Sequence, residues 1–152
     1  MPKLRESFRL RLLDVAPQSP EGDDEIVQAD VRDVDAMAGA CVGVRAVVHL
    51  AAEHDEADFR TLLLPKNIDG TWSAYETAVR ARTPRFVFAS SVQAVGPASV
   101  WCGAGDLARL LVAAVLSDVP FALVHAVSPP ATERFDTSNP FDWTPCERPC
   151  AA

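Results

Sequence analysis

The run Arg45-Ala46-Val47-Val48-His49-Leu50, which is followed by Ala51-Ala52, is the clearest indication of the fold class. Its residues are apolar at consecutive positions rather than at alternate ones, which is typical of a strand buried on both faces of a parallel sheet. A second run of this kind, Arg85 to Ser91, lies beyond a long helical pattern. A parallel sheet with connecting helices is therefore the predicted core.

Strand and helix patterns alternate along the rest of the chain. Further strands are predicted at 8–14, 25–30 and 121–127, and helices at about 33–41, 59–82 and 106–116. This alternation indicates an α/β protein with a three-layer, mainly parallel, doubly wound sheet. We expect this reduced Rossmann-like domain to cover residues 1–128. The five prolines that follow predict an irregular tail at 129–152.

The amino-acid composition and net charge exclude several classes of protein. The chain has 152 residues, of which 49% are hydrophobic and 23% charged, as expected for one globular domain. Its net charge of −7 gives no field that would attract nucleic acid or an anionic membrane surface. Its four cysteines are too scattered for a disulfide framework or a zinc site. We therefore expect a cytoplasmic protein that binds no metal, nucleic acid or membrane.

Three motifs, in the right order, resemble the extended short-chain dehydrogenase/reductases, the NAD-dependent epimerases and dehydratases. The stretch 47–52 looks like the family's fourth strand, and Asn67-Ile68-Asp69-Gly70-Thr71 is similar to its Asn-x-x-Gly-Thr helix motif. The stretch 86–91, followed by Ala94-Val95-Gly96, resembles the strand that carries the active-site serine. Residues 101–127 are similar to the C-terminal part of uronate dehydrogenases.

The resemblance implies roles for particular residues. Asp14 matches the acid that accepts hydrogen bonds from the adenosine ribose, and Asp30-Val31 matches the pair that contacts adenine. Ala51 and Ala52 would complete the cofactor-binding edge. Each acid could equally be a solvated carboxylate at the end of a strand.

The departures from the family pattern are as specific as the matches. The family's first strand ends in a Gly-x-x-Gly-x-x-Gly turn that holds the pyrophosphate, and no such turn precedes Asp14. The Tyr-x-x-x-Lys pair is also unmatched, because the single tyrosine, Tyr75, has Val79 four residues later. We therefore expect no cofactor, with NAD bound weakly or not at all.

The same departures predict an unusual sheet order. The family's sheet has the strand order 3-2-1-4-5-6-7, and removing its first and sixth strands leaves 3-2-4-5-7. When the remaining strands are renumbered along this chain, the order is 2-1-3-4-5, which is flavodoxin-like. The strand that ends at Asp14 should then lie beside the strand that ends at Leu50.

Three side chains are the candidate catalytic residues. His54 lies among acids that would stabilise its imidazolium form, so we expect it to act as a general acid or base. Ser91 would hold a substrate oxygen, and Cys102 is the most plausible reactive thiol. The alternatives are a solvated loop histidine, a hydroxyl that bonds to backbone at the end of a strand, and an inert cysteine.

Three functions remain open at this point. The first is a redox-inactive enzyme that isomerises, dehydrates or cyclises a small oxygenated substrate. The second is a non-catalytic protein that serves in oligomerisation or as an enzyme's partner. The third is an NAD-dependent sugar or uronate dehydrogenase or epimerase. We also expect a homodimer, because the helical pattern at 59–82 carries more apolar residues than one sheet face needs.

Overall fold

The computed structural model describes residues 2–53, 57–91, 101–129 and 135–147. The chain forms two compact units, and we describe each by itself. The central unit is Arg9–Ala89, and the terminal unit combines Met1–Phe8 with Ser90–Ala152. The boundary expected at residue 128 stays a prediction.

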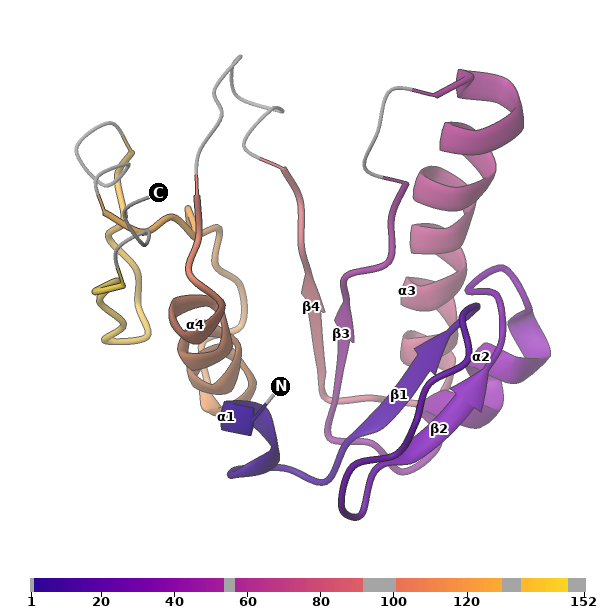
Figure 1. Ribbon diagram of the computed structural model, residues 1–152, viewed down its shortest axis with the longest axis horizontal. Helices are drawn as coiled ribbons and strands as arrows, with labels where there is room; N and C mark the ends of the chain where they lie inside the picture. Colours follow the sequence, from indigo (N-terminus) through magenta and orange to yellow (C-terminus); the bar gives the residue numbers. More distant parts are fainter. Residues whose placement is uncertain (1, 54–56, 92–100, 130–134, 148–152) are drawn as a thin grey trace. The chain divides into compact units, whose positions relative to one another are not determined.

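The central unit alternates strands and helices as predicted (Figure 1). Its elements are β1 (Arg11–Asp14), β2 (Glu25–Gln28), α2 (Val34–Cys41), β3 (Ala46–His49), the π-helix η1 (Phe59–Asp69), α3 (Gly70–Arg80) and β4 (Arg85–Phe88). The helix predicted over 59–82 is thus two helices in succession, and its first part has the wider i→i+5 hydrogen-bond pattern.

The strands form two parallel pairs rather than one sheet. β1 pairs with β2, with Leu13 opposite Val27, and β3 pairs with β4, with Val47 opposite Phe86. These are two of the pairings expected in the order 2-1-3-4-5, but in the described part of the chain no ladder joins β1 to β3. The expected contact between the strand ending at Asp14 and the strand ending at Leu50 is therefore not formed.

The helix layer explains how the two pairs hold together without that ladder. A buried cluster joins Met37 and Cys41 of α2 to Ala74 and Ala78 of α3. Side chains from both strand pairs pack against this cluster, as do neighbours in the turns: Leu13, Val31, Val47, Ala81 and Phe86. Packed helices lie about 8–10 Å apart, roughly twice the spacing of paired strands, so each pair can rest on the helices without meeting the other.

Side chains cap α2 at both of its ends. Asp33 is the N-cap residue, and its side chain accepts a hydrogen bond from the Ala36 amide at 3.0 Å. At the other end, Nη1 of Arg11 donates to the carbonyl oxygens of Ala40 and Val42 at 2.8 and 2.9 Å. Strand β1 thereby fixes the position at which α2 ends.

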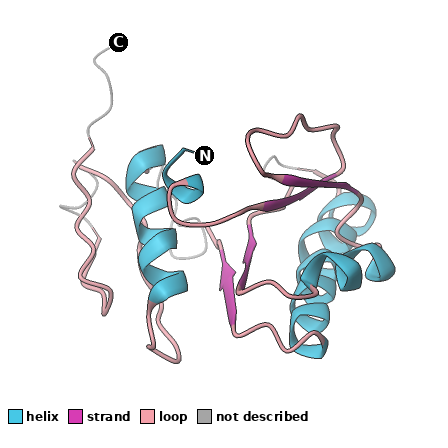
Figure 2. Cartoon of the chain, turned by 90° about the horizontal axis from the view of Figure 1, so that it is seen from below, coloured by secondary structure: helices cyan, strands magenta, loops and turns pink. Residues whose placement is uncertain are grey.

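The terminal unit contains the helices α1 (Pro2–Arg5) and α4 (Ala104–Leu116), which pack against each other. Figure 2 shows α4 and the extended segments that follow it. The buried apolar side chains of this unit are Leu4, Leu110, Leu111, Ala114, Val115, Val127 and Trp143.

The strand predicted at 121–127 is not formed. Phe121 and Leu123 are 83% and 81% exposed, although the segment has the alternating pattern of a strand. A strand needs a neighbouring backbone to pair with, and the described residues of the terminal unit contain no strand that could provide it. Within the described ranges, no helix is long and apolar enough to cross a membrane.

Candidate functional site

The carboxyl edge of the central unit presents an exposed acid at the end of β1. Asp14 is the last residue of that strand, and its Oδ1 accepts a hydrogen bond from the Ala16 amide at 2.9 Å. This turn holds the carboxylate at the position where ligands of parallel α/β sheets bind.

Asp30, in the turn after β2, is already engaged within the chain. Its Oδ1 accepts hydrogen bonds from the Arg32 amide and Nε, both at 2.9 Å, and its Oδ2 lies 2.6 Å from Nη2 of Arg32. These contacts lower the pKa of Asp30 to about 2. A ligand would have to compete with Arg32 for this carboxylate, so Asp14 is the better candidate for contact with a ligand.

The loop after β3 is held by the end of the π-helix. The side-chain amide of Asn67 accepts a hydrogen bond from the Glu53 amide at 2.7 Å and donates to the Glu53 carbonyl at 3.0 Å. Nζ of Lys66 lies 2.6 Å from Oε2 of Glu53. Ala51 and Ala52 precede this clamped residue and are both exposed.

A glycine brings the turn after β2 against the junction of the π-helix and α3. A Cβ atom on Gly70 would lie 2.7 Å from Cγ1 of Val31, so only glycine allows this approach. The same helix end thus contacts both the turn that carries Asp30 and Val31 and the loop that carries Ala51 and Ala52. Val31 therefore meets this helix end directly, and Ala51 and Ala52 immediately precede Glu53, which the same helix end holds.

Of the predicted catalytic residues Ser91 and His54, the structure describes only Ser91. Ser91 is exposed and belongs to the terminal unit, whereas His54 lies outside the described residues. Their joint action on one substrate stays a prediction.

Cys102 also lies in the terminal unit, where it is half-buried. Burial raises the pKa of its thiol, although a hydrogen bond with Ser128 opposes this change. A raised pKa leaves less thiolate at neutral pH, which favours the inert alternative for this cysteine.

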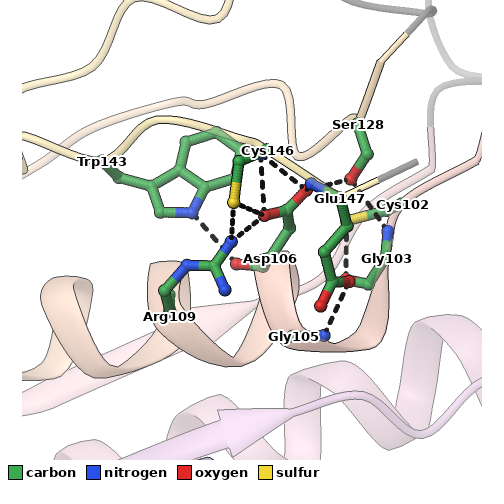
Figure 3. Close-up of polar contacts among 9 residues, drawn as sticks. All are labelled: Cys102, Gly103, Gly105, Asp106, Arg109, Ser128, Trp143, Cys146 and Glu147. Atoms are coloured by element: carbon green, nitrogen blue, oxygen red, sulfur yellow. Dashed lines mark hydrogen bonds and ion pairs between the residues drawn. The ribbon is translucent and has the colours of Figure 1, made fainter.

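A polar cluster that the sequence motifs did not predict surrounds Asp106 (Figure 3). The side chain of Asp106 is fully buried at the start of α4. Its carboxylate accepts hydrogen bonds from the Ser128 hydroxyl at 2.5 Å and from the amides of Cys146 and Glu147 at about 3 Å, and it pairs with Arg109. Burial disfavours the charged form, but these donors outweigh it and lower the pKa of Asp106.

Two glycines complete this cluster. Oε2 of Glu147 accepts a hydrogen bond from the Gly105 amide at 3.1 Å, and a Cβ atom on Gly103 or Gly105 would overlap the Glu147 carboxylate. Nε1 of Trp143 donates to the Asp106 carbonyl at 3.0 Å (Figure 3). The cluster therefore fastens residues 143–147 to the start of α4. The Gly-Ala-Gly-Asp sequence at 103–106 is the one sequence signal for this cluster.

The parallel strand pairs, the helices packed on them and the exposed acid at the end of β1 define an α/β protein of the Rossmann-like class. The chain belongs to the 3-beta hydroxysteroid dehydrogenase/isomerase family, whose family model matches residues 8–104. The family resemblance and the Rossmann-like fold class expected from the sequence are thereby confirmed.

Relatives of this chain include a glucose-6-phosphate dehydrogenase and uronate dehydrogenases. The chain is 40% identical over 98 residues to the NAD-dependent glucose-6-phosphate dehydrogenase of Haloferax volcanii, covering 60% of this chain and 37% of that protein. It is 37% identical to a mutant uronate dehydrogenase from Agrobacterium tumefaciens complexed with NAD, with a TM-score of 0.53 over 58% of this chain and 33% of that one. The chain thus spans about a third of the length of these relatives.

A third comparison concerns the fold alone. Another structure of the Agrobacterium tumefaciens uronate dehydrogenase superposes with a TM-score of 0.70 at 23% identity, over 83% of this chain and 70% of that one. This likeness supports the Rossmann-like assignment of the chain.

The expectation of no cofactor is wrong in the light of these comparisons. One relative is an NAD-dependent enzyme and another was solved in complex with NAD. The expectation rested on the unmatched glycine turn, which holds only the pyrophosphate. The matched residues 8–104 include Asp14, Asp30 and Val31, which the family resemblance assigns to the adenosine half of the cofactor, and the predicted cofactor-binding residues Ala51 and Ala52.

Proposed function

We propose that the central unit binds the adenosine half of NAD, and that the chain takes part in the NAD-dependent oxidation of a sugar or sugar acid. The observation that carries this proposal is the exposed carboxylate of Asp14 at the end of β1, beside a parallel neighbour. An acid at this position of a Rossmann-like sheet accepts hydrogen bonds from the ribose hydroxyls of NAD.

The residues at this edge fit an adenosine. Asp14 offers a charged acceptor to the ribose, whereas the apolar side chains of Val31, Ala51 and Ala52 offer surface for the adenine ring. A carboxylate at position 14 would also repel the extra phosphate of NADP, so the site should prefer NAD. When bound, NAD supplies an acceptor for the hydride that leaves the substrate carbon.

The substrate side of the proposal rests on Ser91. Its exposed hydroxyl would donate a hydrogen bond to the substrate oxygen, as the family resemblance implies. Proton transfer by His54 and a role for Cys102 remain predictions, and so does the cytoplasmic location.

Titration calorimetry with NAD, NADP and AMP tests the proposal. We expect the chain to bind NAD and AMP and to discriminate against NADP. Asp14→Ala should weaken NAD binding about tenfold, because a hydrogen bond to a charged group is lost. Asp23→Asn, an exposed acid in the loop before β2, is the matched control and should change nothing. Equal binding by Asp14→Ala and the unaltered chain would overturn the assignment.

A further inference from the structure

The loop after β3 is fixed by an ion pair that the family motifs did not suggest. Nζ of Lys66 lies 2.6 Å from Oε2 of Glu53, and the two side chains are 43% and 23% exposed. Lys66 is one of only two lysines in the sequence. The pair joins the end of the π-helix to the third residue after Leu50.

The residue that follows Lys66 contacts the same loop position. Asn67 bonds both the amide and the carbonyl of Glu53, at 2.7 and 3.0 Å. Two successive helix residues thus hold Glu53 by its backbone and by its side chain. Only Leu50, Ala51 and Ala52 separate that anchored residue from the end of β3, so the path of this short span is fixed at both ends.

Other charges near this pair come from the turn after β2 and from the helix end. The positive charge of Lys66 contributes to the lowered pKa of Asp30, whose main partner is Arg32, and Asp69 acts in turn on Arg32. The charges therefore alternate in sign from the turn that carries Val31 to the loop that carries the two alanines.

We propose that Lys66 and Glu53 are positioning residues that hold Ala51 and Ala52 in place for the adenine ring of a bound nucleotide. This inference rests on the proposed function. Alanine side chains have no polar group with which to anchor their own loop, and ordering a backbone residue costs roughly 1–2 kcal/mol. A loop that is ordered before binding spares the ligand that cost.

The test compares AMP affinity among variants of the full chain, since AMP carries the adenosine and no nicotinamide. Lys66→Met and Glu53→Gln should each weaken AMP binding about fivefold, and the double variant should be no weaker than either single variant. Lys66→Arg, which keeps the charge, should restore binding. Lys3→Met is the matched control, because Lys3 forms an exposed pair with Glu6 in the terminal unit.

A second measurement follows the loop without any ligand. Amide hydrogen exchange at residues 51–53 should become faster in Lys66→Met, while the midpoint of chemical denaturation changes little. Unchanged hydrogen exchange in Lys66→Met would overturn the positioning role. If the unaltered chain binds AMP, unchanged AMP affinity in Lys66→Met and Glu53→Gln would overturn it as well. If the unaltered chain fails to bind AMP, the proposed function itself falls, and this result is distinct from the failure of the variants.

Discussion

Nε2 of the His49 imidazole lies 3.0 Å from Oγ1 of Thr71, so the last residue of β3 is hydrogen-bonded to the first turn of α3. The imidazole is 5% exposed and stacks against the rings of Phe86 and Phe88. The histidine is therefore part of the packing between strand and helix.

This contact predicts that the protein loses stability as the pH falls. Burial lowers the pKa of His49 below its ordinary value of 6.5, so the unfolded chain binds a proton more readily than the folded one. The stability that the neutral His49 gives the folded state is complete above pH 6.5. It is lost as the pH falls toward the pKa of His49 in the folded state. Urea denaturation at pH 7.5 and 5.5 should show this loss. His49→Phe should abolish the difference, and an equally large difference in that variant would contradict the prediction.

Gly70 and Gly39 should respond in opposite ways to the same substitution. The Cβ of Gly70→Ala would lie 2.7 Å from a methyl group of Val31, whose branched side chain is stiff, so we expect a loss of about 1–3 kcal/mol in the free energy of unfolding. Nothing lies within 4 Å of a Cβ on Gly39, which is in α2, so Gly39→Ala should be neutral or stabilising by about 0.5–1 kcal/mol. Equal denaturation midpoints for the two variants would refute this packing argument.

Arg11 and Arg9 both pair with Glu25, but only Arg11 also caps α2. Arg11→Met removes the donors to the carbonyls of Ala40 and Val42 and should destabilise the central unit by about 1–2 kcal/mol. Arg9 is 68% exposed, so Arg9→Met should have little effect on the free energy of unfolding. Helix content followed by circular dichroism during urea denaturation distinguishes the two variants.

Asp106 should control the attachment of residues 143–147 to α4. In Asp106→Asn the side chain loses its charge and one of the two oxygens that accept from the Ser128 hydroxyl and from the amides of Cys146 and Glu147, at a cost of about 2–4 kcal/mol. Amide hydrogen exchange at Cys146 and Glu147 should become faster. Asp118→Asn, an exposed acid just after α4, serves as the control. Slow exchange at both amides in Asp106→Asn would show that the carboxylate does not hold the segment.

We expect the chain to form a homodimer through the exposed side of α3. Ile68, Trp72, Tyr75 and Val79 lie at helical spacing and are 47–62% exposed. The opposite side of α3 is buried against α2. Sedimentation equilibrium should give a mass near twice the 16.4 kDa of the chain, and Trp72→Glu should shift it toward the monomer. A monomer of the unaltered chain at micromolar concentration would contradict the expectation.

Local patterns predicted much of the central unit because its elements depend on neighbouring residues. The apolar runs that became β3 and β4 are examples. The 3.6-residue period predicted a single interrupted helix at 59–82. It could not show that a π-helix would turn Lys66 and Asn67 toward Glu53.

Contacts between distant residues could not be predicted in the same way. The amide of Cys146 reaches Asp106 across 40 positions of sequence, and no periodicity links the two residues. The segment 121–127 has the composition of a strand, but whether a strand forms depends on a partner that its own residues do not specify. The catalytic roles of Ser91, His54 and Cys102 remain predictions, because they too depend on contacts between residues that are distant in the sequence.

The terminal unit is assembled from both ends of the chain, with the central unit inserted between Phe8 and Ser90. Leu4 of α1 is buried in this unit, and α1 packs against α4. When the central unit is folded, it holds the ends of these two pieces at a fixed separation. When it unfolds, it becomes a long flexible loop whose closure costs additional entropy. The two units are thus thermodynamically linked by the connectivity of the chain alone, so a destabilising change in the insert also weakens the unit that encloses it.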